Sequence, residues 1–423
     1  MNKFSTVIGF AGLNHLGLNT LAAAASKGYF VVGFHDNFKK ISDLKKGNIN
    51  LKEPGLKRLV QKHKKKINLS SNIKSLSSCD IIYISLDVPT NSSGKSNLVI
   101  LNNLINKIKK VINKKVILVI LSQVPPGFTR KIKWNKKKLF YQVETLVFGN
   151  AIKRALYPER IIIGCYKPRT LLQKKLNNYL KSFNCPILPM KYESAELTKI
   201  SINAYLASTI TVSNSLSEIC EKIGADWSEI IPALKMDKRI GKYAYLNPGL
   251  GLSGGNLERD ISTIIKYAKK YKTNCDSIKS WVSNSKYRKK WVWNTFHKLV
   301  LKKNKKPNIC VLGLTYKENT NSIKNSTSIH FIKRLKKYKK VVVYDPGLDN
   351  NSINYPVKFA RNLIEAIKGS DVLLILTPWK QFKTLKPANL SKYMKGRIVI
   401  DPYRNFDGDH LRTNGFTYST LGK

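Results

Sequence analysis

The sequence predicts an α/β protein with three parts: an N-terminal Rossmann-like doubly wound sheet, a central long-helix domain and a C-terminal Rossmann-like α/β domain. Short runs rich in Val and Ile alternate with amphipathic stretches near the start of the chain and again near its end. Between these two series, residues 194–223 carry apolar side chains at helical spacing without Pro or Gly. A chain of 423 residues is long enough for two or three such domains.

Five short β-branched runs indicate the strands of the first domain, which we assign to residues 1–190. They are TVIGFAG, YFVVGFHD, DIIYISLD, KVILVILSQ and RIIIGC. Amphipathic stretches separate them, so the pattern is a βαβ series that implies a parallel sheet. The opening MNKFSTVIGFAGL has no small-residue cleavage site and continues into a turn. It therefore predicts a buried strand rather than a signal peptide.

The central domain, residues 191–285, is expected to contain one long helix with Ser194 as its N-terminal cap. Long central helices of this kind usually separate domains or pair with a second subunit, so we expect a homodimer or a larger homo-oligomer. A basic, aromatic connecting helix and linker follow at 286–306. The runs NICVLGLTY, KVVVYDPG, DVLLILT and RIVIDPY then define a second α/β domain at 307–423.

The formal charge of +51 has two interpretations. A functional charge would bind nucleic acid, anionic lipid or an acidic substrate. Compositional drift toward lysine would give the same total, and the abundance of Asn and Ile favours drift. The lysines are spread through KHKKK, NKKKL, LKKNKKP and RLKKYKK instead of forming one basic arm. We therefore expect no specific nucleic-acid partner, only salt-dependent nonspecific attraction to polyanions.

The cysteine pattern and the apolar runs restrict the class of protein further. The six cysteines form no CxxC pair and no metal-type spacing, which indicates reduced thiols in a cytoplasmic protein and no metal site. No uninterrupted apolar run approaches the roughly 18–20 residues that a membrane span needs. We therefore expect no membrane-spanning segment.

A glycine-rich segment, GFAGLNHLGLNT, lies between the first expected strand and the first expected helix. Gly12 and Gly17 occupy the first and third positions of a GxGxxG motif, whereas Asn14 occupies the middle position. The middle glycine normally lets a pyrophosphate approach the backbone closely. The strand–turn–helix context favours dinucleotide binding despite this departure.

The end of the second expected strand should meet the adenosine ribose. His35 occupies this strand end and Asp36 follows it. His35 can hydrogen-bond a ribose hydroxyl without repelling a 2′-phosphate, and Lys39 and Lys40 come next. NAD is the expected cofactor and NADP the alternative. The alternative for His35 and Asp36 is a solvent-exposed strand end that binds no ligand.

Nine further motifs occur in one order along nearly the whole chain: EPGL, VPTNSSGKSNL, SQVPPGFTR, ETLVFGNAI, YPERIIIG, SAELTKISINAYLA, DKRIG, GLTYKENTNSIKNS and DPYRN. In order and spacing they resemble the UDP-glucose/GDP-mannose dehydrogenase family. The resemblance implies oxidation of a nucleotide-sugar CH2OH to a carboxylate in two NAD-dependent hydride transfers, with UDP-sugars the favoured substrates in nucleotide-sugar and polysaccharide biosynthesis. It also implies a dimerising helical middle and a C-terminal domain that helps to hold the nucleotide.

Four residues are the expected catalytic side chains that this chain retains. Lys199 and Asn203 are four residues apart on the long helix, so they share one face and can address the same substrate oxygen. An ammonium at that position would stabilise the alkoxide that forms as hydride leaves. The resemblance implies that Glu144 activates or positions water, and that Asp260 has a similar base or orienting role.

The resemblance implies binding roles for the other matched positions. Thr90 and Gln123 would line the nicotinamide side, although Gln123 replaces a more usual threonine. Arg239 would reach the substrate of a neighbouring subunit. Lys317 and Arg404 would contact cofactor and nucleotide, respectively.

The turn GLSGGNLERD raises a chemical problem. It retains Gly254 and Gly255, which would lie against the substrate, but Asn256 occupies the position of the family's nucleophilic cysteine. Cys275 lies too far along the chain to replace it without an unusual fold-back. Three outcomes remain open: the reaction stops at the aldehyde, water hydrates the aldehyde for a non-covalent second oxidation, or the protein is a catalytically altered paralogue that only binds its ligands.

Two other classes of protein remain as rivals. A polyanion-binding or nucleic-acid-binding protein would explain the charge, but it predicts basic residues gathered on one face with interleaved aromatics. A hydroxyacid or 3-hydroxyacyl dehydrogenase would share the Rossmann start and the long helix. Such an enzyme would not carry the second α/β domain or the GLTYK and DPYRN motifs.

Overall fold

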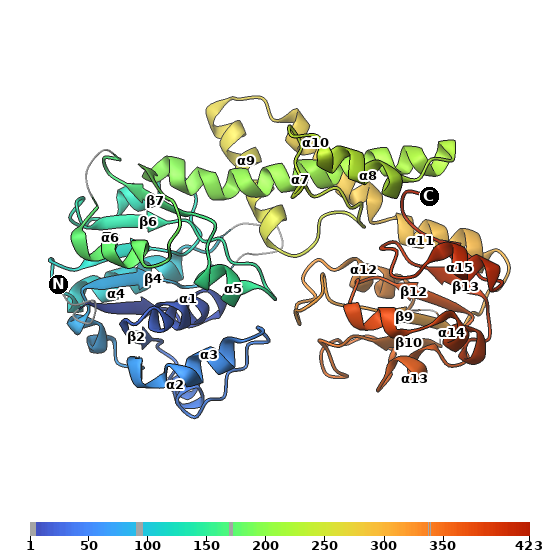
Figure 1. Cartoon of the computed structure of the whole chain (residues 1–423), viewed down its shortest axis with the longest axis horizontal. Helices are drawn as coiled ribbons and strands as arrows, with labels where there is room; N and C mark the ends of the chain where they lie inside the picture. The colour runs from blue at the N-terminus through green and yellow to red at the C-terminus, as the bar shows by residue number, and fades with distance from the viewer. Residues whose placement is uncertain (1–5, 90–95, 169–171, 337, 339) are drawn as a thin grey trace. The chain divides into compact units, whose positions relative to one another are not determined.

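The computed structural model describes residues 6–89, 96–168, 172–336, 338 and 340–423 (Figure 1). The chain divides into two compact units, Met1–Ile202 and Asn203–Lys423. We call them the N-terminal unit and the C-terminal unit, and describe each by itself.

The N-terminal unit is built on one eight-stranded sheet with the order β3-β2-β1-β4-β5-β6-β7-β8. All neighbouring strands are parallel except β6 and β7. The strands are β1 Val7–Ala11, β2 Phe30–Phe34, β3 Ile67–Ser70, β4 Ile81–Ile84, β5 Ile117–Ile120, β6 Leu139–Gln142, β7 Ile161–Cys165 and β8 Ile187–Lys191. The helices are α1 His15–Ser26, α2 Phe38–Lys45, α3 Leu56–Lys62, α4 Val99–Val111, α5 Ala151–Leu156 and α6 Lys174–Lys181.

Helices cover both faces of this sheet, as the βαβ pattern predicts. One apolar cluster packs α1, α3 and α6 against one face, and a second packs α4 against the other. In α1 the run of four alanines at 22–25 is completely or almost completely buried, because small side chains let the helix approach the strands closely. The strand order reverses direction between β1 and β4. Ligands of doubly wound sheets bind at such a point, beyond the carboxyl ends of the strands.

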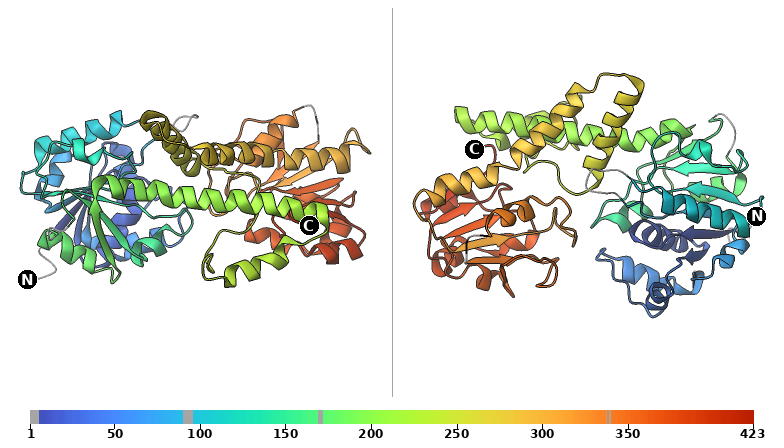
Figure 2. Two further views of the ribbon diagram at one scale, coloured as in Figure 1. Left: turned by 90° about the horizontal axis from the view of Figure 1, so that it is seen from above. Right: turned by 180° about the vertical axis from the view of Figure 1, so that it is seen from behind.

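Helix α7, Tyr192–Ile223, is one uninterrupted helix of 32 residues that contains the boundary between the two units (Figure 2). It confirms the expected long helix. The expected cap at Ser194 is wrong, because the helix begins two residues earlier, directly after β8. Ser194 therefore lies in the first turn, where its carbonyl accepts a hydrogen bond from the hydroxyl of Thr198.

The C-terminal unit contains a second parallel sheet with the order β11-β10-β9-β12-β13-β14. Its strands are β9 Ile309–Leu312, β10 Val341–Tyr344, β11 Lys358–Phe359, β12 Val372–Ile375, β13 Ile398–Ile400 and β14 Thr417–Ser419. The helices are α8 Trp227–Met236, α9 Asn256–Tyr271, α10 Asp276–Arg288, α11 Trp291–Phe296, α12 Thr327–Arg334, α13 Leu363–Ile367, α14 Pro387–Tyr393 and α15 Gly408–Thr413. Apolar clusters on both faces of the sheet confirm a second doubly wound fold.

A smaller apolar cluster joins the C-terminal part of α7 to the helices that follow it. Ala207, Leu252 and Ile261 form its buried centre. This cluster fixes the start of α9 beside α7 within the C-terminal unit. Among the residues that the structure describes, no helix has both the length and the apolar character needed to cross a bilayer.

Candidate active site

The turn between β1 and α1 has the backbone geometry that a dinucleotide requires. Gly12 has a φ of +102°, and a Cβ there would lie 2.8 Å from the backbone of Leu86. At Gly17 a Cβ would lie 1.7 Å from the carbonyl oxygen of Gly12. The buried hydroxyl of Ser85 donates to the same oxygen at 2.9 Å. Only glycines fit at both positions, and they hold the chain close to the start of α1, so this turn fits the pyrophosphate of NAD.

The middle position of the glycine motif has its own polar partners. Asn14 precedes α1 as its N-cap residue but makes no capping bond, and its side-chain oxygen accepts a hydrogen bond from the ammonium of Lys40. The backbone N–H of His15 donates to the carboxylate of Asp87 at 3.0 Å. The carboxylate of Asp87 therefore lies against the first turn of α1, where the pyrophosphate of a dinucleotide would bind. No local sequence pattern points to Asp87, because 72 residues separate it from His15.

The end of β2 presents polar groups that suit a ribose. The Nδ1 atom of His35 accepts from the backbone N–H of Asn37 at 3.1 Å and lies 3.1 Å from Asp36. Burial lowers the pKa of His35, and the charge of Lys40 lowers it further. The imidazole is therefore neutral near pH 7. The carboxylate of Asp36 is exposed.

Glu53, from the EPGL motif, connects the glycine-rich turn to the loop after β6. Its carboxylate accepts from the backbone N–H groups of Gly149 at 3.0 Å and Ala151 at 2.7 Å, and from the ring of His15 at 3.0 Å. That ring stacks on Phe148 with 3.9 Å between centroids. Burial alone would raise the pKa of Glu53, but these hydrogen bonds together lower it. An ionised carboxylate thus fixes the loop that carries Glu144.

The first pair of expected catalytic residues lies within the N-terminal unit. The ammonium of Lys199 on α7 lies 3.3 Å from the carboxylate of Glu144, and both side chains are more than four-fifths shielded from water. Glu144 also accepts from the backbone N–H of Leu146. One turn before Lys199, the fully buried Glu196 accepts from the N–H of Thr129 at 2.8 Å. Glu196 therefore ties the start of α7 to the loop after β5.

The second pair lies within the C-terminal unit. The side-chain amide of Asn203 on α7 donates to the carboxylate of Asp260 on α9, which is only 2% exposed. Arg259 also donates to Asp260, at 3.2 Å. Lys199 and Asn203 are one turn apart on α7. Each has an acidic partner: Glu144 for Lys199 and Asp260 for Asn203. A buried carboxylate with two donors is held in one orientation, as an orienting group requires.

The glycine turn before α9 is shaped by close contacts in the C-terminal unit. Gly254 has a φ of +80°, and a Cβ there would lie 2.9 Å from the ring of Tyr316. Its N–H donates to the carbonyl of Lys324 at 3.1 Å, and the side chain of Lys324 also fills the space beside Gly255. Asn256 is the exposed first residue of α9. The turn therefore presents an amide at the N-terminus of a helix, where a thiolate would be stabilised.

Cys275 lies far from Asn256 along the helix that separates them. It precedes α10 and is buried, whereas Asn256 begins α9, a helix of 16 residues. At a rise of 1.5 Å per residue, about 24 Å of helix separates the two positions. This separation agrees with the expectation that Cys275 could reach the position of Asn256 only by an unusual fold-back.

The remaining expected binding residues differ in how far they are exposed to solvent. Gln123 is half-buried after β5, and Thr90 lies outside the described residues. Lys317 is half-buried, with its ammonium 5.9 Å from the ring centroid of Tyr316. The guanidinium of Arg239 is almost fully exposed and pairs with Asp237 at 2.6 Å.

Arg404 forms contacts within the C-terminal unit that sequence analysis did not foresee. It has a φ of +53°, and its guanidinium lies 2.7 Å from the carboxylate of Asp226. It also donates to the carbonyl of Gly422 at 3.2 Å. These contacts give Arg404 a structural role in addition to the ligand contact that the motif implies.

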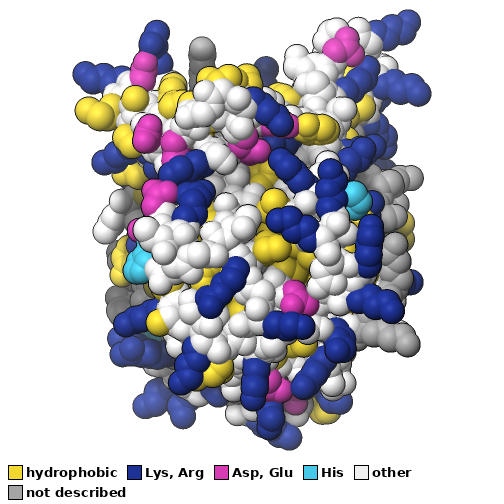
Figure 3. All heavy atoms as spheres, turned by 90° about the vertical axis from the view of Figure 1, so that its right-hand side faces the viewer, with side chains coloured by type: hydrophobic (Ala, Val, Ile, Leu, Met, Phe, Trp, Pro, Cys, Tyr) yellow, Lys and Arg dark blue, Asp and Glu magenta, His cyan; other side chains and the backbone are white. Residues whose placement is uncertain are grey.

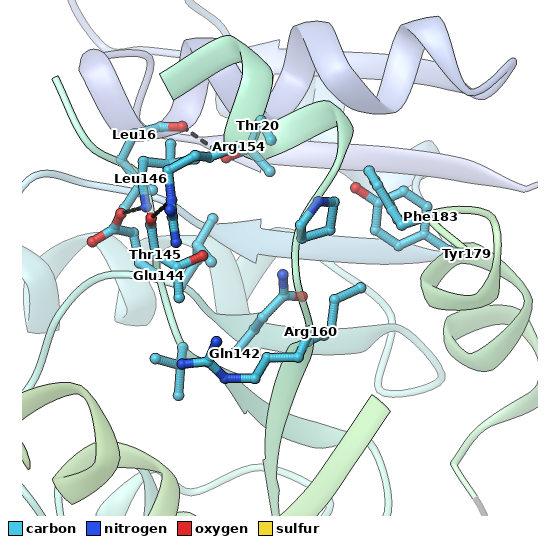
Figure 4. Close-up of a pocket in the computed structure, with 15 residues that line it drawn as sticks. Leu16, Thr20, Gln142, Glu144, Thr145, Leu146, Arg154, Arg160, Tyr179 and Phe183 are labelled. Atoms are coloured by element: carbon cyan, nitrogen blue, oxygen red, sulfur yellow. Dashed lines mark hydrogen bonds between the residues drawn. The ribbon is translucent and has the colours of Figure 1, made fainter. Parts of the chain in front are cut away.

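A cavity of about 50 Å³ lies beside Glu144 in the N-terminal unit (Figure 4). Its lining includes Gln142 and Arg160, which lie next to each other in the figure, and the aromatic rings of Tyr179 and Phe183. Its lining is mixed, and a space of this size with several polar side chains in its walls is large enough for a water molecule. Glu144 thus pairs with the ammonium of Lys199 and also lines this cavity.

Basic side chains cover the visible surface without forming a single patch. Figure 3 shows Lys and Arg scattered over the face in view, with acidic and apolar side chains among them. This dispersed arrangement is what compositional drift predicts, and a nucleic-acid-binding face would gather its cations.

Family models and curated relatives match most of the chain. Three models of the UDP-glucose/GDP-mannose dehydrogenase family match the chain: the NAD binding domain at residues 6–183, the central domain at 193–286 and the UDP binding domain at 310–408. A UDP-glucose 6-dehydrogenase of Rickettsia prowazekii is 30% identical over 432 residues, which cover 98% of this chain and 99% of that protein. A Bacillus subtilis UDP-glucose 6-dehydrogenase is 28% identical, with 97% of this chain and 96% of that protein covered.

Solved structures show the same fold. A UDP-D-ManNAc dehydrogenase from Pyrococcus horikoshii has a TM-score of 0.85 at 22% identity, with 99% of each chain covered. A UDP-glucose dehydrogenase from Pyrobaculum islandicum has a TM-score of 0.83 at 22% identity, with 98% of this chain and 97% of that chain covered.

Proposed function

Because the chain belongs to the UDP-glucose/GDP-mannose dehydrogenase family, we propose that it oxidises the C6 CH–OH group of a UDP-sugar without a covalent enzyme intermediate. It is an NAD-dependent nucleotide-sugar dehydrogenase of that family. The observation that carries the proposal is that Lys199, Asn203, Glu144 and Asp260 all keep buried polar partners, whereas Asn256 stands where the resemblance expects a cysteine.

NAD would be held by Gly12, Gly17 and the ribose-facing groups His35 and Asp36, and when bound it accepts the hydride. Lys199 acts on the substrate oxygen. Its ammonium, held 3.3 Å from Glu144, stabilises the alkoxide left when the hydroxyl gives its proton to water. That alkoxide becomes the aldehyde as the hydride leaves for NAD. Asn203, one turn along α7, donates a hydrogen bond to the same oxygen.

Asp260 keeps Asn203 in place during this step. Its buried carboxylate accepts the amide hydrogen of Asn203, which leaves the second amide hydrogen and the amide oxygen for the substrate. Asp260 is therefore a positioning residue in this proposal.

The second oxidation, where it occurs, uses water instead of a thiol. Glu144 lines the cavity that can hold water, so it is placed to take a proton from a water molecule that attacks the aldehyde. The resulting gem-diol can pass a second hydride to a second NAD, bound after the first NADH has left, and loss of its protons to water leaves the carboxylate. If hydration is slow, the product is the aldehyde.

The test measures NADH and product for a panel of UDP- and GDP-sugars with purified protein. The proposal expects NADH with a UDP-sugar, and free aldehyde or carboxylate with no enzyme adduct in the protein's mass spectrum. A trapped covalent sugar would contradict the non-covalent route. NAD binding without NADH from any sugar would favour the catalytically altered paralogue.

We also propose that the enzyme is a homo-oligomer assembled through α7. Its outer face carries a row of exposed apolar side chains at spacings of three, four and seven residues: Tyr205, Val212, Leu216, Ile219 and Ile223. Such a row is typical of a helix that packs against a second copy of itself. The exposed Arg239 would then be available to a neighbouring subunit's substrate.

A further inference from the structure

We propose that Asp87 is an internal competitor of the cofactor, because its carboxylate takes the N–H donors of α1 that the diphosphate of NAD must use. This inference rests on the NAD dependence in the proposed function and adds a residue that controls cofactor affinity.

The contact that carries the proposal is local and specific. The carboxylate of Asp87 accepts from the backbone N–H of His15 at 3.0 Å, at the first residue of α1. The first N–H groups of a helix have no partner within the helix, and they are the groups that bind a pyrophosphate in this kind of fold. A carboxylate and a diphosphate cannot both use them without strong repulsion.

Asp87 reaches this position from the segment that follows β4. Ser85 anchors that segment, because its hydroxyl donates to the carbonyl of Gly12 at 2.9 Å. The backbone of Leu86 also lies directly against Gly12. Asp87 is thus fixed next to the glycine turn by the chain that precedes it.

The charges around Asp87 act in opposite directions. Desolvation raises the pKa of Asp87 although the residue remains partly exposed, the positive charge of His15 would lower it, and the carboxylate of Glu144 raises it. On α2, Lys40 interacts electrostatically with Asp87 and donates to Asn14. Glu53 pairs with the ring of His15. A bound diphosphate adds further negative charge, which would raise the pKa of Asp87 again and favour its protonated form.

NAD binding and protonation of Asp87 should therefore be coupled. Protonated Asp87 no longer repels the diphosphate, so NAD binding takes up a proton, and affinity rises as pH falls toward the pKa of Asp87. Lys40, released from Asn14, provides the cation that the bound diphosphate needs. The Asn14–Lys40 pair thereby compensates for the absence of a glycine at the middle position.

The experiment measures the dissociation constant of NAD by calorimetry for wild type, Asp87→Asn and Asp87→Gly, from about pH 5.5 to about pH 8.5. Both variants should bind NAD about tenfold or more tightly at neutral pH, the effect of removing one charged competitor for a hydrogen-bond donor. Their affinity should lose the pH dependence of wild type. Buffers of different ionisation enthalpy should reveal proton uptake only in wild type.

Two controls make the result specific. Asp43→Asn removes one carboxylate from the same unit and should leave the NAD affinity unchanged. ADP should gain affinity in the Asp87 variants, whereas adenosine, which has no diphosphate, should not. Equal NAD affinity for wild type and both variants at every pH would overturn the inference and leave the proposed function intact. Absence of NAD binding in all three proteins would instead remove the proposed function.

Discussion

The ammonium of Lys199 lies 3.3 Å from the carboxylate of Glu144, and both groups are largely shielded from water. Partial burial of this pair strengthens its electrostatic interaction relative to an exposed ion pair. An ammonium held in this way is already oriented before substrate arrives, and that preorganisation is what stabilisation of a developing alkoxide requires. The pair therefore gives the clearest target for mutation.

Replacing Lys199 with Ala should lower the rate of the first NADH formation about 10²- to 10³-fold, because the substrate oxygen loses its cationic partner. The affinity for NAD should not change. Single-turnover absorbance measures the rate, and Lys222→Ala provides the matched control, since Lys222 is exposed near the end of the same helix. Equal rates for Lys199→Ala and wild type would refute the assignment.

Asn256→Cys should restore a reactive thiol, because the first turn of α9 lowers the pKa of a cysteine placed there. The variant should form a mass-detectable adduct with the sugar aldehyde and release a second NADH per sugar. Asn274→Cys, at an exposed position before α10, should do neither. Equal iodoacetamide reactivity of the two new thiols would show that the turn no longer favours a thiolate.

Gly17→Ala should abolish NAD binding while the rest of the sheet still folds. The added Cβ would lie 1.7 Å from the carbonyl oxygen of Gly12, so the turn that receives the pyrophosphate must move. Calorimetry measures the loss, and circular dichroism checks the fold. Gly249→Ala is the control, because a Cβ there meets nothing within 4 Å. Normal NAD binding by Gly17→Ala would disprove this role of the turn.

The stability of the C-terminal unit should fall at low pH through Asp226. Burial alone would raise its pKa, but the hydrogen bonds from Arg404 and Ser228 lower it well below the usual range. A depressed folded-state pKa means that the stabilisation is present above the unfolded value of about 3.9 and is lost as pH falls through the folded value. Urea unfolding should therefore show Asp226→Asn clearly less stable than wild type at neutral pH, with the difference shrinking in acid.

The matched variant for that measurement is Glu318→Gln, which removes a half-buried carboxylate of the same unit. Its effect on the free energy of unfolding should be small at both pH values. A stability difference between Asp226→Asn and wild type that did not change with pH would contradict the linkage.

Replacing Val212 and Ile219 together with Glu should dissociate the proposed oligomer. Both side chains are more than half exposed on the same face of α7, and two charges there would prevent apolar packing against a second copy. Light scattering after gel filtration measures the molecular mass. Lys222→Glu, on the same helix, should keep the mass of wild type. A monomeric wild-type protein would disprove the proposed assembly.

The sequence predicted those parts of the fold whose signal is local. The strands that became β1, β2, β4, β5 and β7 are almost completely buried and β-branched, so composition alone reveals them. In the same sheet it did not reveal β3, β6 or β8. The four residues of β3, INLS, include only one buried side chain, β6 has the mixed sequence LFYQ, and β8 is a half-exposed strand that contains Pro189. The start of α7 was displaced by two residues for a related reason, since β8 continues into the helix with no connecting loop.

In the candidate site, too, the sequence predicted the residues with a local signal and missed those brought together by the fold. Lys199 and Asn203 could be placed on one helical face from spacing alone, and Gly12 and Gly17 from their motif. The carboxylate partners could not, because Asp87 meets His15 across 72 residues and Glu53 meets Ala151 across 98. Contacts at such separations depend on how the sheet brings its loops together, and no local pattern encodes them.

The continuity of α7 makes the chemistry sensitive to chain length at one place. Within a helix, each residue advances the chain by about 1.5 Å and turns it by about 100°. Removing a single residue between Lys199 and Asn203 would leave the buried pairings on one side intact and rotate every following side chain by that angle. Such a deletion would move the amide of Asn203 off the helical face that carries Lys199, even though both side chains would be unchanged.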